Sequence, residues 1–154
     1  LEVLGRAAFG SNSDLYRELV IEERAVQFLS AGFGLARDPA LVDLTTMVSD
    51  PANVEAVEAR ILEEVERFRT ESVDPATLEA TKSNMKYGFL MRLENAQGIA
   101  FSLIGFVINT GGIEAVETYY QTLDGVTAEH LGEAARRYLV PDHRTTVTMI
   151  QAED

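Results

Sequence analysis

The sequence has no cysteine, no tryptophan and only four prolines among its 154 residues. Without cysteine the chain has no disulfide, no thiol nucleophile and no thiolate metal site. Basic residues are also scarce: 13 Lys and Arg stand against 25 Asp and Glu, a net charge of −12. Proteins bind nucleic acids mainly through Lys and Arg. Anionic lipid surfaces likewise attract Lys and Arg side chains. The charge therefore disfavours both as partners.

Long apolar runs are missing as well. The longest covers residues 99–108, about half of the roughly 20 residues that a membrane-spanning helix needs. We therefore predict no membrane span and interpret the run as a buried helix. No signal peptide is visible, and the compartment stays open, because a cysteine-free chain suits both cytosol and periplasm.

The length predicts one domain over residues 1–154, large enough to bury roughly 68–70% of its unfolded surface. Residues 26–35 and 41–48 are predicted strands, joined by a turn at residues 36–40 that contains an Asp-Pro step. So short a connection makes the pair antiparallel. In the second strand, Val42, Leu44, Thr46 and Val48 form the better core face. Residues 145–151, rich in β-branched side chains, predict a final strand.

Helices account for most of the remaining chain. Residues 1–9 resemble the end of a helix, and a helix from Asp14 can be capped by Ser11, Asn12 or Ser13. Asp-Pro steps at Asp50 and Asp74 begin two more. The predicted core stripes of these two helices are Val54, Val57, Ile61, Val65 and Phe68, then Leu78, Met85 and Phe89. Further helices are expected over residues 96–109, 113–123 and 127–139.

The order of these elements predicts an α+β fold: a two-layer sandwich with helices on one face of a mixed or antiparallel sheet. Three strands are few for such a sheet. We therefore expect a first strand before residue 1, which would make the chain truncated at its N-terminus.

Acidic residues concentrate in residues 50–79, which hold nine Asp and Glu against three Arg. We interpret this stretch as a solvated helix face, supported by a Glu63–Arg67 pair. The alternative is an electrostatic surface for a basic partner.

No catalytic constellation emerges from the residue types. His130 and Glu133 have the spacing of an inverted zinc motif, but Ala134 stands where its second histidine belongs. With only His143 besides, three ligands cannot be assembled. Gly32 and Gly34 resemble part of a glycine-rich dinucleotide-binding loop. They lie inside a predicted strand, however, and not between a strand and a helix, where such a loop belongs. Seven further residues at helical spacing are predicted core rather than ligand contacts: Met85, Tyr87, Met91, Phe101, Phe106, Tyr119 and Tyr120.

Five short motifs in order are similar to the second domain of the pitrilysin (insulinase-like, inverzincin) zinc peptidases. The first is Gly-x-x-Ser-x-Leu-Tyr-x-x-Leu at residues 10–19. The others are Asp-Pro-Ala-Thr-Leu-Glu-Ala-Thr-Lys at 74–82, Leu-Glu-Asn at 93–95, Val-Thr-x-Glu-x-Leu at 126–131 and Tyr-Leu-x-Pro-Asp at 138–142. The resemblance implies a LuxS/mitochondrial-processing-peptidase-like fold and a bacterial origin, in cytoplasm or periplasm.

The family implies a chamber of paired domains that processes or degrades peptides. Zinc and the catalytic Glu lie in another domain or subunit, so this chain is expected to hold no metal and no catalytic residue. In the half of the family's chamber that lacks zinc, an Arg and a Tyr contact the substrate. The corresponding positions of this sequence hold Val20 and Gln27. Arg24 and Gln27 remain the expected contacts to peptide in the cleft.

The expected partners are therefore a zinc-bearing domain or subunit of the same family and a peptide substrate. One alternative is a catalytically inactive relative that serves as an assembly scaffold or binding module. Another is an unrelated α+β binding domain. Exposed apolar surface and a sheet edge also lead us to expect self-association.

Overall fold

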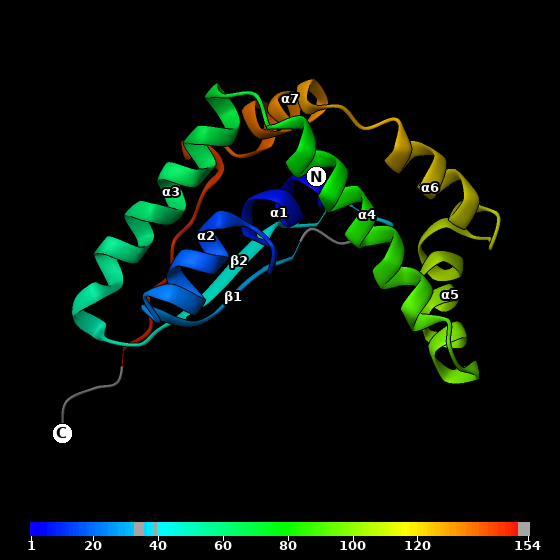
Figure 1. Cartoon of the computed structure of the whole chain (residues 1–154), viewed down its shortest axis with the longest axis horizontal. Coiled ribbons are helices and arrows are strands. Elements are labelled where there is room, and N and C mark those ends of the chain that lie inside the picture. Colours follow the sequence, from blue (N-terminus) through cyan, green and yellow to red (C-terminus); the bar gives the residue numbers. More distant parts are fainter. Residues whose placement is uncertain (33–35, 39, 151–154) are drawn as a thin grey trace.

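The computed structural model describes residues 1–32, 36–38 and 40–150. It has the predicted α+β fold (Figure 1). The elements in chain order are α1 (Glu2–Phe9), α2 (Asp14–Tyr16), the π-helix η1 (Arg17–Glu22), β1 (Val26–Gly32), β2 (Asp43–Val48), the 3₁₀ turn η2 (Pro51–Asn53), α3 (Val54–Thr70), α4 (Pro75–Arg92), α5 (Ala96–Thr110), α6 (Ala115–Asp124), α7 (Ala128–Tyr138) and the 3₁₀ turn η3 (Pro141–His143).

Side-chain caps fix where the helices begin. The hydroxyl of Ser13 accepts a hydrogen bond from the Tyr16 N–H at 3.1 Å, and Asp74 accepts one from the Thr77 N–H at 2.9 Å. Each cap satisfies a backbone donor that has no partner inside the helix. At the other end of α5, Gly111 adopts φ +86°, a left-handed conformation that suits glycine.

The sheet has two antiparallel strands, paired from Val26 opposite Val48 to Gly32 opposite Asp43. A bulge at Gln27 interrupts the register, because Val26 pairs with Val48 while Phe28 already pairs with Met47. The extra residue changes the alternation along β1, so that Val26 and Leu29 both face the core, at 1% and 6% exposure.

Helices cover one face of this sheet. The core joins α1, α2, η1, α3, α4, α6 and α7 to the inner side chains of β1. Val57, Phe68, Leu78, Met85 and Phe89 are buried as predicted. On β2, Leu44, Thr46 and Val48 are half-buried and Thr45 and Met47 are exposed, as the predicted core face requires. The prediction is wrong for Val42, which is 38% exposed because it precedes Asp43, the first paired residue of β2.

Two predicted elements differ from the structure. Residues 145–150 form no strand, and Val147, Met149 and Ile150 are 73–92% exposed; residue 151 lies outside the described residues. A strand requires a neighbour to pair with, and these residues have no hydrogen-bonded neighbour among the described ones. The predicted turn at 36–40 and the end of the first strand lie partly outside the described ranges.

Helix α5 is not buried, contrary to the prediction. It has no buried residue, and Phe101 is 70% exposed. Tyr87 and Met91 of α4, also predicted as core, are 66% and 64% exposed, whereas Phe106, Tyr119 and Tyr120 are half-buried. The C-terminal half of α4, together with the whole of α5 and α6, extends away from the sheet (Figure 1).

Within the described residues, no single helix is long and apolar enough to cross a membrane. Helices α5 and α6 meet the length and composition requirement only as a pair, with a bend of 90° between them.

Candidate functional site

The first motif forms the turn between α1 and α2. A Cβ at Gly10 would overlap the carbonyl oxygen of Arg6, so only glycine fits at this close approach. Ser13 is 5% exposed and caps α2, while Leu15 and Leu19 point into the core. The motif thus has a structural role: it sets the direction of the helix that leads to β1.

Helix α2 continues as the π-helix η1, a departure from the predicted α-helix. Its wider turn is marked by the Glu23 N–H, which donates to the Glu18 carbonyl five residues earlier, at 2.9 Å. Single π turns are rare and occur often at functional sites. Here the π turn ends next to Arg24, one of the two predicted peptide contacts.

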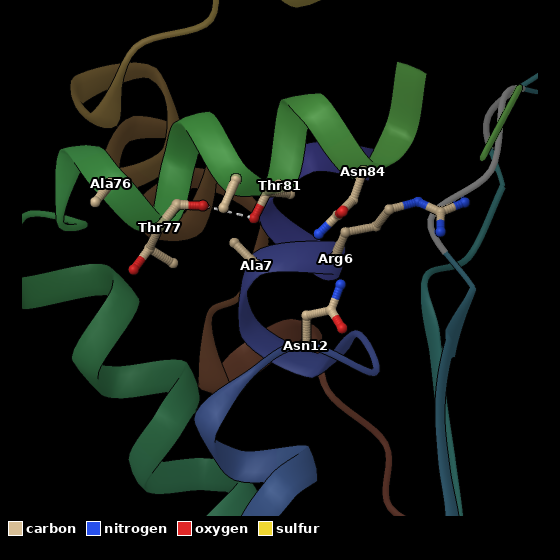
Figure 2. A pocket seen from close by; sticks show the side chains of 8 residues that line it. Arg6, Ala7, Asn12, Ala76, Thr77, Thr81 and Asn84 are labelled. Atoms are coloured by element: carbon tan, nitrogen blue, oxygen red, sulfur yellow. Dashed lines mark hydrogen bonds between the residues drawn. The ribbon is translucent and has the colours of Figure 1, made fainter. Parts of the chain in front are cut away.

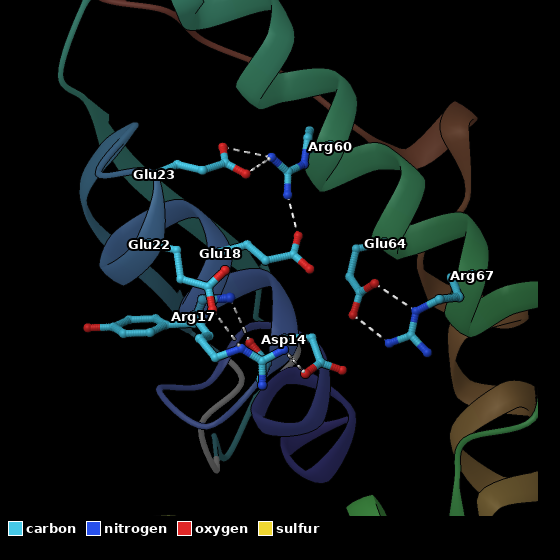
Figure 3. A network of polar contacts seen from close by, with 10 residues as sticks. Asp14, Arg17, Glu18, Glu22, Glu23, Arg60, Glu64 and Arg67 are labelled. Carbon is cyan, nitrogen blue, oxygen red and sulfur yellow. Dashed lines mark hydrogen bonds and ion pairs between the residues drawn. The ribbon is translucent and has the colours of Figure 1, made fainter.

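Ion pairs hold η1 against α3 (Figure 3). The Arg60 guanidinium of α3 bonds both carboxylate oxygens of Glu23, at 2.8 and 2.9 Å, and also pairs with Glu18. The hydrogen bond to Glu23 is the largest of the effects that raise the pKa of Arg60. On the other side, Arg17 pairs with Asp14 and Glu22. The acidic side chains around the start of β1 are therefore matched by arginines.

Arg24 lies at the junction between η1 and β1. Its φ of +54° is the only positive value at a non-glycine residue in the described chain. Its carbonyl oxygen accepts a hydrogen bond from the Ser49 hydroxyl at 3.0 Å. The side chain is exposed. Strained backbone of this kind persists where its surroundings fix it, and it is enriched at functional sites.

Gln27, the second predicted contact, is the extra residue of the β1 bulge. Its side chain is exposed, as are those of Phe28 and Ser30 on the face of the sheet that no described helix covers. Bulges re-aim side chains next to binding sites. The structure thus places Arg24 and Gln27 three residues apart, both exposed and both on irregular backbone. Their contact with peptide stays a prediction.

A cavity of about 270 Å³ lies beside the first motif, between α1 and α4 (Figure 2). Its lining residues are Arg6, Ala7, Asn12, Ala76, Thr77, Ala80, Thr81 and Asn84. Arg6 and the two asparagine amides bring hydrogen-bond donors to its mouth, which suit carboxylate or carbonyl oxygens. The sequence analysis missed this cavity, because residues about 70 positions apart form it.

A second cavity of about 220 Å³ lies where α1, α4, α5 and α6 meet. Four half-buried or buried rings surround it: Phe89, Phe106, Tyr119 and Tyr120, with centroid separations of 5.1–6.2 Å. The Arg92 guanidinium carbon lies 5.9 Å from the Phe89 ring centroid. The rings pack mainly on one another, mostly in the edge-to-face arrangement that aromatic pairs favour.

His130 has a local role at the start of α7. The His130 backbone N–H donates to the Thr127 hydroxyl, and its ring Nδ1 accepts from the Thr127 N–H at 3.2 Å, which makes a capping box. Glu133 and Arg137 have the i, i+4 spacing of a helical ion pair, but the described contacts contain no such pair, and the Arg137 guanidinium lies over the Tyr138 ring. Likewise Arg67 pairs with Glu64 rather than Glu63.

The described residues contain no group of three or more His, Cys, Asp or Glu side chains arranged to hold a metal ion. Asp and Glu are plentiful, but the ion pairs described above already engage those near Arg24. The part of the chain that the structure describes therefore does not supply the three protein ligands of a catalytic zinc site.

No family model matches the sequence, and no curated protein matches it. Solved structures do share its fold. A protease from Helicobacter pylori superposes with a TM-score of 0.75 at 22% identity, over 90% of this chain and 33% of that one. A conserved protein from Enterococcus faecalis V583 superposes with a TM-score of 0.63 at 19% identity, over 88% of this chain and 32% of that one. The chain thus has a fold that occurs in a protease, and it spans about a third of the length of both proteins.

Proposed function

We propose that this chain is a non-catalytic, chamber-forming domain of a zinc-dependent endopeptidase of the pitrilysin type. The observation that carries the proposal is the superposition on the Helicobacter pylori protease over 90% of the chain. The five ordered motifs at residues 10–19, 74–82, 93–95, 126–131 and 138–142 agree with it. The zinc ion and the catalytic Glu would lie in a second domain or subunit of the same family.

The role assigned to this chain is to shape a wall that unfolded peptide contacts. Arg24 brings a permanent positive charge and five N–H donors, and Gln27 brings an amide that both donates and accepts. An extended peptide exposes main-chain carbonyls that such groups bind. The open face of β1 next to Gln27 offers further apolar contact through Phe28, which is 39% exposed.

The proposed lack of peptidase activity can be tested on the unmodified chain. A quenched fluorescent peptide is incubated with the chain and a slight excess of Zn²⁺, with and without chelator. We expect no cleavage above the protein-free rate and no zinc retained after gel filtration. Chelator-sensitive cleavage that co-purifies with the chain contradicts the proposal.

The wall function is tested by fluorescence anisotropy with a labelled unstructured peptide. We expect weak binding that falls several-fold in a double variant, Arg24→Gly with Gln27→Ala. Glycine suits the positive φ at residue 24, so the variant removes the side chain without new strain. Arg37→Gly is the matched control, because Arg37 is an exposed arginine elsewhere on the chain. Equal loss in the control, or no loss in the double variant, argues against this surface.

A further inference from the structure

The second cavity, where α1, α4, α5 and α6 meet, has a lining that suits a small ligand. Four aromatic rings supply most of its apolar wall, and the other side chains of the lining are polar: Glu2, Arg92, Ser102 and Asn109. Small-molecule sites in proteins are mostly apolar, with a few polar groups that converge on the ligand. We call this site the aromatic cavity.

Helix α5 places its two half-buried polar side chains at the cavity. Within residues 99–108, Ser102 is the only polar residue, and it lines the cavity together with Asn109. The two residues are seven positions apart, which puts them on one face of the helix. By contrast, the apolar side chains of Phe101 and Ile104 are 70% and 51% exposed. A surface helix normally has the reverse arrangement, with its polar side outward.

Both polar side chains of α5 have hydrogen-bonding capacity to spare. The Ser102 hydroxyl takes part in no hydrogen bond among the described contacts. Asn109 donates from Nδ2 to the Gly105 carbonyl at 2.8 Å, and its Oδ1 accepts no hydrogen bond among the same contacts. Each can therefore bind a ligand without breaking a contact within the protein.

Arg92 brings a positive charge to the cavity, and no acidic side chain pairs with it among the described contacts. Its guanidinium carbon lies 5.9 Å from the Phe89 ring centroid. Burial raises the pKa of Tyr120, and the charge of Arg92 counteracts this rise. The positive charge is therefore felt inside the cavity, at the ring of Tyr120.

Glu2, the acidic residue of the lining, already has partners. One of its carboxylate oxygens accepts a hydrogen bond from the Tyr119 hydroxyl at 2.6 Å, and the other lies 3.5 Å from the Arg6 guanidinium. The charge of Glu2 is thus matched by Arg6, whereas that of Arg92 is not matched. The cavity therefore favours an anion, and the guanidinium geometry suits a carboxylate.

The cavity has room for one more ring. Its volume is about 220 Å³, and an apolar cavity of about 150 Å³ in another protein binds benzene. A Cβ at Gly105, which lines the cavity, would meet no atom within 4 Å, so space is open beside this position. A guest ring would make edge-to-face contacts like those between the rings of the wall.

We propose that the aromatic cavity binds a small aromatic carboxylate. The ring of the ligand lies among Phe89, Phe106 and Tyr120, and its carboxylate pairs with the Arg92 guanidinium. Ser102 offers a hydroxyl donor in the same lining. The proposal does not depend on the proposed peptidase role. A free aromatic acid and the C-terminal residue of a peptide that ends in an aromatic side chain both have this chemistry.

A cationic ligand fits the cavity less well, although aromatic rings also bind cations. The Arg92 guanidinium already lies over the Phe89 ring, and it would repel a second positive charge. Preferential binding of a cation is therefore an outcome that overturns the proposal.

Amide NMR spectra of the isotopically labelled chain test the proposal, with phenylacetate as the probe. We expect the amide signals of Ser102, Gly105 and Tyr120 to shift and to saturate at millimolar phenylacetate. Phenylacetamide, the uncharged analogue, should bind at least about tenfold more weakly, because hydrogen bonds between charged groups are the stronger ones. Phenethylamine, the cationic analogue, should bind more weakly still. A dipeptide that ends in phenylalanine binds more tightly than phenylacetate if peptide ends are the source, and less tightly if free acids are.

Two variants separate the charge from the hollow. Arg92→Gln should weaken phenylacetate binding at least about tenfold and leave phenylacetamide binding unchanged. Arg144→Gln is the control, because Arg144 is an exposed arginine with no ion pair among the described contacts. Gly105→Leu fills the open space and should abolish the binding of both probes, while circular dichroism shows that the variant is folded.

Several results would overturn the proposal. These are no shift at millimolar phenylacetate, shifts confined to residues away from the cavity, or tighter binding of phenethylamine than of phenylacetate. Equal binding of phenylacetate and phenylacetamide, or equal phenylacetate binding by Arg92→Gln and the wild type, would also overturn it, because the cavity would then be an apolar hollow without selectivity for a carboxylate.

Discussion

The hydroxyl of Tyr119 donates a hydrogen bond to the carboxylate of Glu2 at 2.6 Å, across 117 positions of the sequence. The bond joins α6 to α1 at the edge of the aromatic cavity, and Glu2 also pairs with Arg6. Burial and this hydrogen bond to a carboxylate raise the pKa of Tyr119 well above that of a free phenol. The contact connects the extended α4–α5–α6 arm to the body of the domain.

The first prediction concerns alkaline pH. The folded chain holds the Tyr119 proton more tightly than the unfolded chain, whose phenol titrates near pH 10. Stability from this group is therefore complete below about pH 10 and is lost as the pH rises above it. Urea unfolding from pH 8 to 11 should show a steeper decline in the wild type than in Tyr119→Phe. Parallel declines would show that this proton is not linked to folding.

The second prediction tests the cap of the first motif. Ser13→Ala removes the acceptor for the Tyr16 N–H and should lower the free energy of unfolding by about 1 kcal/mol. Ser11→Ala, at an exposed serine two residues earlier, should change it by less than about 0.5 kcal/mol. Chemical denaturation of both variants measures the difference. Equal losses of stability in the two variants would mean that the Ser13 cap contributes nothing beyond the turn itself.

The third prediction concerns the motif glycine. In Gly10→Ala the new methyl group meets the Arg6 carbonyl, so the backbone must shift, at a cost of about 1–3 kcal/mol. Gly105→Ala is the comparison, because a Cβ at Gly105 meets no atom within 4 Å. That substitution should be neutral or stabilising, since alanine favours helix. Thermal unfolding should therefore show a lower melting temperature for Gly10→Ala and an unchanged or higher one for Gly105→Ala.

The fourth prediction uses ionic strength. Arg60→Met removes the bridge from α3 to Glu18 and Glu23 and should destabilise the chain by up to about 1 kcal/mol at low salt. The difference from wild type should shrink in 1 M NaCl, where charges are screened beyond roughly 3 Å. Arg37→Met removes the same charge from a residue with no ion pair among the described contacts. Its effect on stability should be small at both salt concentrations.

The fifth prediction concerns the bulge. In a regular strand Val26 and Leu29, three positions apart, would lie on opposite faces, whereas the bulge places both in the core. Deletion of Gln27 leaves them two positions apart, so a strand without the bulge also keeps both on the core face. We therefore expect the deletion to cost less than the roughly 1.5–3 kcal/mol of exposing one large aliphatic side chain, and Gln27→Ala, which keeps the bulge, to be close to neutral. Urea unfolding of both variants measures the cost. A loss of that full size in the deletion variant would show that Val26 or Leu29 has left the core.

Much of the fold was predictable because it depends on local signals. The Asp-Pro steps, Ser13 and Thr127 each satisfy backbone groups next to them, so they mark helix starts without knowledge of the tertiary structure. The stripe from Val57 to Phe68 also follows from spacing alone. The bulge had a signal too: Val26 and Leu29 are apolar at a spacing of three, which a regular strand would place on opposite faces.

The remaining features depend on distant partners. The composition of α5 indicates that it needs a cover, but it does not say whether this chain supplies one. Residues 145–150 have strand propensity, yet no described segment pairs with them. The two cavities, the Arg60 bridge and the Tyr119–Glu2 bond join residues 37 or more positions apart, and no spacing rule finds them. The predicted peptide contacts, Arg24 and Gln27, await the binding experiment.

The bulge also affects how relatives of this chain should be aligned. Homologues without the additional residue at position 27 would need a one-residue gap there before their inward side chains correspond to these. An ungapped alignment would match core residues of one protein with solvent-facing residues of the other along the whole strand. Identity would then be underestimated in the segment that carries the proposed peptide contacts.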